Sequence, residues 1–163
     1  VYALTESLTP GESYLIVNRD DAGNGVAFGR KYGKDQTNVQ VEIKTGSSNE
    51  KYIETDMSDK SYAVFKCTEN HALGNSDAGT TGYIQLATQG GHYVGHNLIT
   101  SEDDATKWQY HNNLLSGRVP DSQGDYGYFY YNSNGWFTAY CSWQYLHQEV
   151  YLYQKQKDYA FDE

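Results

Sequence analysis

The clearest structural signal in the chain is Tyr126-Gly127-Tyr128-Phe129-Tyr130-Tyr131, which is followed at once by Asn132-Ser133-Asn134-Gly135. Five aromatic rings in six residues are typical of a β-strand, because bulky side chains pack well on a pleated surface. The four residues that follow tolerate positive φ and therefore predict a tight turn. Together the two parts predict the first half of a β-hairpin.

Runs of the same kind recur along the chain. β-Branched and aromatic residues, alternating or continuous, are found at Ser13 to Val17, Val39 to Ile43, Tyr62 to Cys67, Tyr83 to Thr88 and Val150 to Tyr153. Clusters rich in Gly, Asn, Asp and Ser separate them. The nearest approach to a helical pattern, residues 101–108, is short and acidic, so at most one helical turn is expected there. The chain is therefore predicted to be all-β.

A weak internal repeat suggests how the strands are grouped. The runs Tyr14-Leu15-Ile16-Val17, Tyr83-Ile84-Gln85-Leu86 and Tyr128-Phe129-Tyr130-Tyr131 each precede a glycine-containing turn and a second strand-like run. Three such units favour a β-trefoil-like fold or another closed barrel, and a β-sandwich is the alternative.

One domain accounts for nearly all of the chain. With 163 residues the chain is long enough for a single core, and no linker rich in Ser, Thr or Pro marks a boundary. We therefore predict a single all-β binding domain over residues 1–154. The charged residues 155–163 are expected to form a tail, or a linker to the rest of a larger multidomain protein.

The charge balance argues against two classes of partner. Lys and Arg number 12 against 21 Asp and Glu, which gives a formal net charge of -9. Such a chain repels nucleic acid phosphates and anionic lipid. No run of about 20 apolar residues is present to cross a bilayer, and the first residues lack a signal-peptide pattern. We expect neither a nucleic acid nor a membrane partner, and interpret the chain as a domain excised from a longer protein.

The two cysteines allow two interpretations. Cys67 and Cys141 match neither a CxxC redox motif nor a zinc knuckle. They could be two small buried hydrophobic residues, or they could be bridged. In an oxidising compartment we expect the disulfide, which would stabilise the fold by about 4 kcal/mol.

The C-terminal part of the chain is too aromatic to be entirely buried. Residues 126–153 contain eight Tyr, two Trp and two Phe. Because side chains alternate along a strand, Tyr126, Tyr128 and Tyr130 are expected on one face, with Phe129 on the other. One row of rings should then face solvent or a ligand.

Exposed aromatic rings are suited to saccharides. A Tyr or Trp ring covers the apolar C–H face of a sugar, while neighbouring polar groups fix its orientation. The favoured platform is Trp143 with Tyr140 and Tyr145, which lie in a loop-like segment. Two neighbours complete this group of candidate ligand-binding residues, His147 and Tyr130.

The other two Trp residues have contexts typical of packing positions. Trp108 follows a polar turn and opens a strand, as a core anchor does. Trp136 directly follows Asn134-Gly135 and is expected to pack on the adjacent hairpin.

The spacing of the histidines does not fit a metal site. His92 and His96 are four residues apart in a glycine-rich stretch, and on a strand this places them about 13 Å apart. We therefore expect no metal. Tyr93, His96 and Asn97 are instead candidates to hydrogen-bond a sugar.

No catalytic signature is recognisable. The chain has no GxSxG motif, and neither cysteine lies near a histidine in a known arrangement. The acidic segments 18–24 and 101–104 lack the spacing of an EF-hand and are interpreted as solvated loops. We expect no enzymatic activity, no catalytic residues and no cofactor.

The order of segments resembles accessory, carbohydrate-binding-module-like domains of secreted glycosidases and surface proteins of gut-associated bacteria. The resemblance is carried by Tyr2 to Asn18, Lys107 to Gly117, Gly135-Trp136 and Val150 to Tyr153. The chain departs from that pattern at Ala139 to His147, where a short turn rich in Ser and Thr is expected. The resemblance implies a secreted or cell-surface appendage that binds sugars or mediates adhesion.

These observations together predict a non-catalytic carbohydrate-binding module of a larger secreted or cell-surface protein, with a glycan or polysaccharide as its partner. The alternative is a protein-protein adhesion or spacer domain, since Tyr and Trp also dominate protein interfaces.

Overall fold

The structure is a computed structural model that describes residues 1–19, 23–29, 38–55, 63–75, 82–87, 96–119, 126–131, 137–141 and 149–156. Nearly all of its regular structure is β-strand, so the predicted all-β class is confirmed. The one helical turn expected at residues 101–108 is also present, as the 3₁₀ turn η2 at Glu102–Asp104. Within the described residues no helix is long and apolar enough to span a membrane.

The strands follow one another with short connections. They are β1 (Tyr2–Thr5), β2 (Ser13–Arg19), β3 (Asn24–Phe28), β4 (Asn38–Glu42), β5 (Lys44–Thr45), β6 (Lys51–Ile53), β7 (Phe65–Cys67), β8 (Leu73–Asn75), β9 (Gly82–Leu86), β10 (His96–Ile99), β11 (Gln109–His111), β12 (Leu114–Arg118), β13 (Tyr126–Tyr131), β14 (Phe137–Cys141) and β15 (Tyr151–Lys155).

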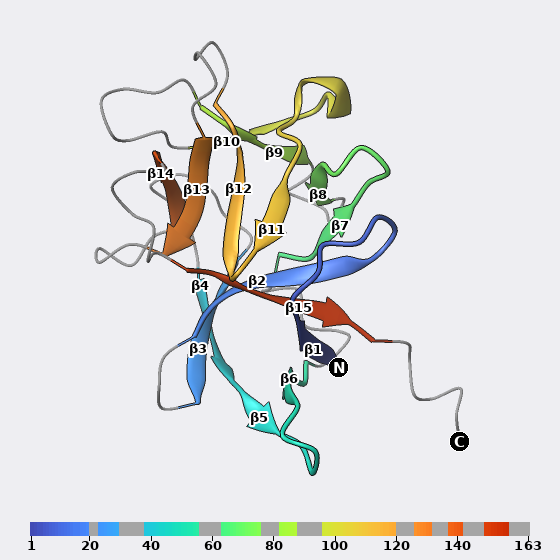
Figure 1. The fold of residues 1–163 in the computed structure, drawn as a ribbon, viewed down its shortest axis with the longest axis vertical. Coiled ribbons are helices and arrows are strands. Elements are labelled where there is room, and N and C mark those ends of the chain that lie inside the picture. Colours follow the sequence, from blue (N-terminus) through green and yellow to red (C-terminus); the bar gives the residue numbers. More distant parts are fainter. Residues whose placement is uncertain are drawn as a thin grey trace.

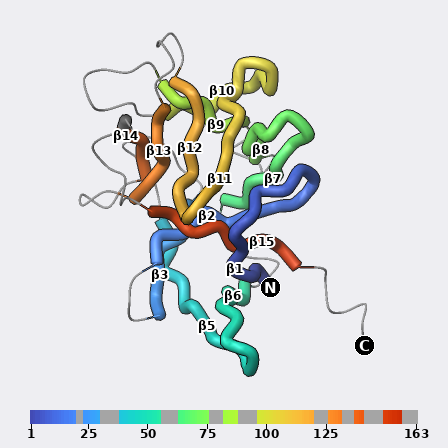
Figure 2. Tube along the Cα trace, viewed as in Figure 1, coloured from blue at the N-terminus to red at the C-terminus, as the bar shows by residue number. Residues whose placement is uncertain are grey.

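The strands form two antiparallel sheets. The larger has the order β10-β9-β8-β7-β2-β15-β1-β6-β5, with β3 paired to β2 and β4 paired to β3. The smaller has the order β11-β12-β13-β14, and its strands lie side by side in the upper half of Figure 1. The first and last parts of the chain meet in the larger sheet, where β15 lies between β2 and β1 (Figure 2).

Part of the larger sheet curls around a small apolar cluster. Only Ile43 separates β4, which pairs with β3, from β5, which pairs with β6. Pairing runs from β2 to β3 and β4 on one side, and from β2 through β15, β1 and β6 to β5 on the other, while the chain itself joins β4 to β5. The buried residues of this lower cluster are Tyr2, Leu15, Val17, Ala27, Val41, Ile43, Ile53 and Tyr153.

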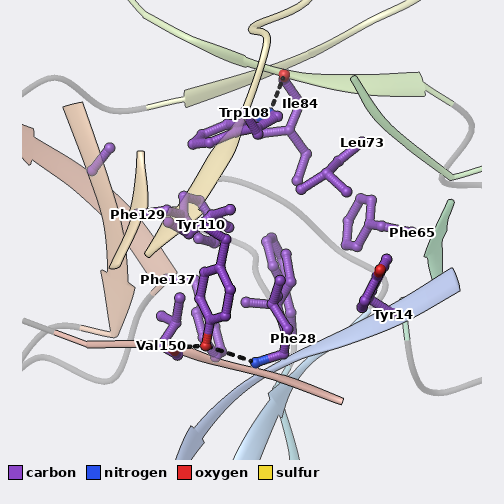
Figure 3. Close-up of a cluster of buried hydrophobic side chains, with 14 of the residues drawn as sticks. Tyr14, Phe28, Phe65, Leu73, Ile84, Trp108, Tyr110, Phe129, Phe137 and Val150 are labelled. Carbon is purple, nitrogen blue, oxygen red and sulfur yellow. Dashed lines mark hydrogen bonds between the residues drawn. The ribbon is translucent and has the colours of Figure 1, made fainter. Parts of the chain in front are cut away.

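The main core lies between the two sheets (Figure 3). Its centre is aromatic: the ring of Phe28 stacks on Phe137 at 5.1 Å between centroids and on Phe129 at 5.7 Å. Trp108, predicted as a core anchor, is buried here, and its ring meets Phe129 edge-on at 6.1 Å. Its indole N–H donates to the carbonyl of Ile84 at 3.4 Å, which connects the start of β11 to β9.

The favoured closed barrel is corrected by this arrangement. The strands of the smaller sheet pair only with one another, so the described strands form two sheets and not one barrel. A core that lies between two sheets matches the alternative, a β-sandwich. The three repeated units are nevertheless present as consecutive antiparallel pairs: β2 with β3, β9 with β10, and β13 with β14.

A tyrosine hydroxyl joins the two sheets through the core. Tyr110 on β11 is 6% exposed, and its hydroxyl donates to the carbonyl of Val150 at 2.9 Å. The same oxygen accepts from the backbone N–H of Leu152 at 3.3 Å (Figure 3). The Val150 N–H in turn donates to the carbonyl of Asn113 at 3.0 Å. Burial raises the pKa of the Tyr110 hydroxyl, which is therefore neutral and able to donate.

Replacing Tyr110 by Phe should lower the free energy of unfolding by about 1 to 3 kcal/mol, because the Leu152 N–H loses its acceptor in a buried place. Urea unfolding measures this loss. The matched control is Tyr83→Phe, since Tyr83 is partly exposed and its hydroxyl makes no hydrogen bond within the described residues. Equal losses for the two variants would contradict a bridging role.

The predicted disulfide is also corrected. Cys67 is a free thiol, fully buried in the main core on β7 of the larger sheet. Its Sγ donates weakly to the carbonyl of Thr68 at 3.6 Å, and burial raises its pKa to about 11. Cys141 ends β14 in the other sheet, and its side chain lies outside what the structure describes. The second interpretation, a small buried hydrophobic residue, is the one that fits Cys67.

A buried thiol with a raised pKa should react slowly, because the thiolate is the reactive form. In a Cys141→Ser variant at pH 8, iodoacetamide should label Cys67 at least about tenfold more slowly in the native protein than in urea. Mass spectrometry over time measures both rates. If native labelling is as fast as unfolded labelling, or if never-reduced wild-type protein takes no label even when unfolded, the burial of a free thiol is wrong.

The last described strand extends one residue beyond the predicted boundary at residue 154. Lys155, assigned to the tail from sequence, is the last residue of β15 and pairs with Tyr2. The N–H of Gln156 donates to the carbonyl of Val1 at 2.9 Å. Residues 157–163 lie outside the described residues, and the predicted tail or linker there stays a prediction.

Candidate functional site

The two faces of the smaller sheet differ in chemistry. In register, Tyr128 on β13 lies between Ser116 on β12 and Tyr140 on β14. Because directly opposed residues share a face, this register fixes one face for all four strands. That face carries Gln109, His111, Leu114, Ser116, Arg118, Tyr126, Tyr128, Tyr130, Thr138 and Tyr140. The opposite face carries Tyr110, Leu115, Phe129, Phe137 and Ala139, which belong to the main core.

We call the first of these the outer face. Three of its tyrosines, Tyr126, Tyr128 and Tyr140, are partly exposed. Tyr130 is only 4% exposed, and its ring meets that of Tyr140 at 5.2 Å with an interplanar angle of 66°. Tyr130 therefore supports the ring of Tyr140 and offers little surface of its own. Of the predicted row on β13, Tyr126 and Tyr128 are partly exposed, whereas Tyr130 is buried and belongs to the main core.

A pocket of about 390 Å³ opens where the outer face meets the turn before β11. Its lining residues are Asp104, Ala105, Thr106, Lys107, Gln109, Arg118 and Tyr126. Arg118 and Tyr126 are directly opposed in the pairing of β12 with β13, so the pocket and the tyrosine row are continuous. The site thus combines an aromatic surface with a hollow lined by polar groups.

Hydrogen bonds hold the wall of this pocket in place. The side chain of Thr106 is buried, and its hydroxyl accepts from the N–H of Leu86 at 2.8 Å. The amide of Gln85 donates to the carbonyl of Asp104 at 2.8 Å. On the other wall, the amide of Gln109 donates to the hydroxyl of Ser116 at 3.3 Å. The turn that bears Asp104 is therefore attached to β9, and Gln109 is attached to β12.

Two of the residues that line the pocket are cations. Lys107 and Arg118 are exposed, and neither forms an ion pair with a residue that the structure describes. Asp104 is the one described carboxylate in the lining. The described pocket residues thus carry one more positive than negative charge, in a chain whose net charge is -9.

The structure brings only some of the predicted site residues together. Tyr130 and Tyr140 share the outer face, as described above. His96 and Asn97 lie on β10, at the end of the larger sheet, and are not part of the outer face. The other predicted ligand-binding residues lie outside the described residues: Tyr93, Trp143, Tyr145 and His147.

The ring of His96 points into the main core. It meets Phe129 edge-on at 5.2 Å and Phe28 edge-on at 6.0 Å. Burial lowers the pKa of His96 to about 4, so the ring is neutral at pH 7. Its neighbour Asn97 is exposed. This placement gives His96 a packing role within the structure.

The low pKa of His96 should make stability depend on pH. Between about pH 6.5 and pH 4 the unfolded chain binds a proton at His96 that the folded chain does not, so the free energy of unfolding falls as the pH is lowered. The loss from this group should reach about 2 kcal/mol at pH 5. Urea unfolding at pH 7 and pH 5 measures it.

The control compares how much the free energy of unfolding falls between pH 7 and pH 5 in each variant, and not the stability of the variants at one pH. His96→Gln should flatten the loss between pH 7 and pH 5, whereas His111→Gln, at an exposed position, should leave it unchanged. If wild type and His96→Gln lose the same free energy of unfolding between pH 7 and pH 5, His96 is not the cause of the pH dependence.

Sequence reasoning missed most of the pocket. In Lys107-Trp108-Gln109-Tyr110 the buried Trp108 and Tyr110 alternate with exposed Lys107 and Gln109, and this alternation was a usable signal. No comparable signal places Asp104 or Arg118 beside them, because that proximity depends on the pairing of strands.

No group of three or more His, Cys, Asp or Glu side chains that could hold a metal ion occurs within the described ranges. Comparison of the chain with protein-family models, with curated proteins and with solved structures gives no match. The outer face and its pocket are therefore interpreted from their own chemistry.

Proposed function

We propose that this domain is a non-catalytic carbohydrate-binding module, and that the outer face of the smaller sheet is its binding surface. The observation that carries the proposal is the row of partly exposed rings, Tyr126, Tyr128 and Tyr140, which continues into a polar pocket. The sheet beneath is rigid because its other face packs in the main core. Such a surface is ordered before a ligand arrives, which lowers the entropic cost of binding.

The chemistry of the face matches that of a saccharide. A pyranose ring presents apolar C–H groups that stack on an aromatic ring, and its hydroxyl groups need donors and acceptors at the edge of the contact. Tyr128 and Tyr140 supply neighbouring rings on paired strands. Gln109, Arg118 and Asp104 supply polar groups at one end of the row.

The proposed setting is a larger secreted or cell-surface bacterial protein, in which the domain keeps its parent near a glycan. This part rests on the resemblance of segment order to accessory domains of such proteins. The cysteines lend it no support, since Cys67 is a free thiol. Trp143, which follows β14 in the chain, remains a predicted contributor to the platform.

A glycan array followed by calorimetric titration tests the function. Tyr128→Ala should weaken binding of the best array ligand by about ten- to a hundredfold, because one stacking contact is lost. Its thermal unfolding should change little, since Tyr128 packs on the outside of the sheet. The matched control is Tyr52→Ala, which removes a partly exposed tyrosine from β6 in the larger sheet.

The outcomes separate this function from its alternative. Binding that is lost in Tyr128→Ala and kept in Tyr52→Ala supports the proposal. A blank array together with specific capture of a protein, lost in the same variant, would instead make the outer face a protein-protein adhesion surface. Equal effects of the two substitutions on glycan binding would place the ligand elsewhere.

A further inference from the structure

We propose that the pocket binds the carboxylate of an acidic sugar, so that the preferred glycan contains uronic or sialic acid residues. This inference rests on the proposed glycan function and names its ligand class. The pocket lies at the end of the tyrosine row, so one saccharide chain can stack on Tyr128 and place an acidic residue beside Tyr126.

The charges in the pocket carry the inference. The protein has 21 acidic and 12 basic residues, yet two cations, Lys107 and Arg118, line the same hollow. Within the described residues neither is paired with a carboxylate. With Asp104 in the same lining, the described lining residues carry one more positive than negative charge, an excess that one carboxylate on a ligand would balance.

The geometry of the donors favours a planar anion. The guanidinium of Arg118 offers parallel N–H groups that match the two oxygens of a carboxylate. Directly across the strand pair lies Tyr126, whose ring can cover the apolar face of the sugar that bears the carboxylate. A volume of about 390 Å³ is at the lower end of the range for small-molecule sites, which suits a short saccharide.

Recognition must act at short range. A net charge of -9 repels an acidic glycan at a distance, so the field of the whole protein does not steer such a ligand to the site. Asp104 adds a local repulsion. Selectivity for an acidic sugar therefore depends on direct contact with Lys107 and Arg118. Removing one of these cations should strongly weaken binding of the acidic sugar.

The test uses acidic oligosaccharides in matched pairs. Probes that contain galacturonate, glucuronate or sialic acid are each titrated beside the same oligosaccharide with its carboxylates methyl-esterified, which removes the charge and keeps the sugar. The wild-type protein should bind at least one acidic probe about tenfold more tightly than its ester.

Two variants, one that removes a positive charge and one that removes a negative charge, separate recognition of the carboxylate from damage to the fold. Arg118→Gln should weaken binding of the acidic probe about tenfold and binding of its ester by a clearly smaller factor, so that the preference for the acid falls. Asp104→Asn should strengthen binding of the acidic probe by about threefold, since a repulsive charge is lost. Lys66→Gln removes an exposed cation on β7, which lies away from the pocket, and should change binding of neither the acidic probe nor its ester. A variant that merely disturbed the site would weaken binding of the acidic probe and of its ester by the same factor.

The results distinguish failure of the acidic-sugar inference from failure of the glycan function. Equal affinity for every acid and its ester, or tighter binding of a sulfated than of a carboxylated probe, overturns the inference and leaves the glycan function intact. If the array and all probes are blank, the glycan function fails and the inference fails with it. An acid-specific affinity that Arg118→Gln removes and Asp104→Asn increases supports it.

Discussion

Burial of β2 on both faces is the constraint on which the rest of the structure depends. Tyr14 and Ile16 point into the main core, whereas the alternate residues Leu15 and Val17 point into the lower cluster. All four are fully buried. A shift of this strand by one residue would exchange the two sets of side chains, and each cluster would receive residues of the wrong size. The register of β2 therefore also fixes that of its partners β3, β7 and β15.

This constraint reaches the candidate site through one side chain. β15 is held by pairing with β2, and the hydroxyl of Tyr110 binds the backbone of β15 on both sides of Tyr151. Tyr110 thereby sets the position of β11, and the pairing of β12 and β13 follows from it. Apolar rings then fill the inner face of the smaller sheet, and Tyr126 and Tyr128, which alternate with them, are left partly exposed. The aromatic outer face is thus a by-product of closing the main core.

Local features of the fold were predictable from sequence because they depend on neighbours in the chain. Alternation identified the strand at Tyr126–Tyr131, and context identified Trp108 as buried.

Proximity across strands was not predictable. The position of Arg118 opposite Tyr126 depends on register, which no single segment encodes. The same holds for His96: alternation gives two faces of β10 but does not say which one meets Phe129. The joining of hairpins into two sheets likewise depends on long-range packing.

The position of β15 between β2 and β1 has a consequence for how the chain acquires its structure. The first and the last of the described strands, β1 and β15, are neighbours in the same sheet, since Tyr2 pairs with Lys155, and β15 also pairs with β2 through Leu152 and Ile16. Neither cluster can be completed until β15 has left the ribosome, because Leu152 belongs to one and Tyr153 to the other. Contacts so distant in sequence impose a large loop-closure entropy before they contribute favourable energy, and such topologies fold in milliseconds to seconds. Until then β2 exposes an apolar strand on both faces, and the growing chain depends on protection from aggregation for that interval.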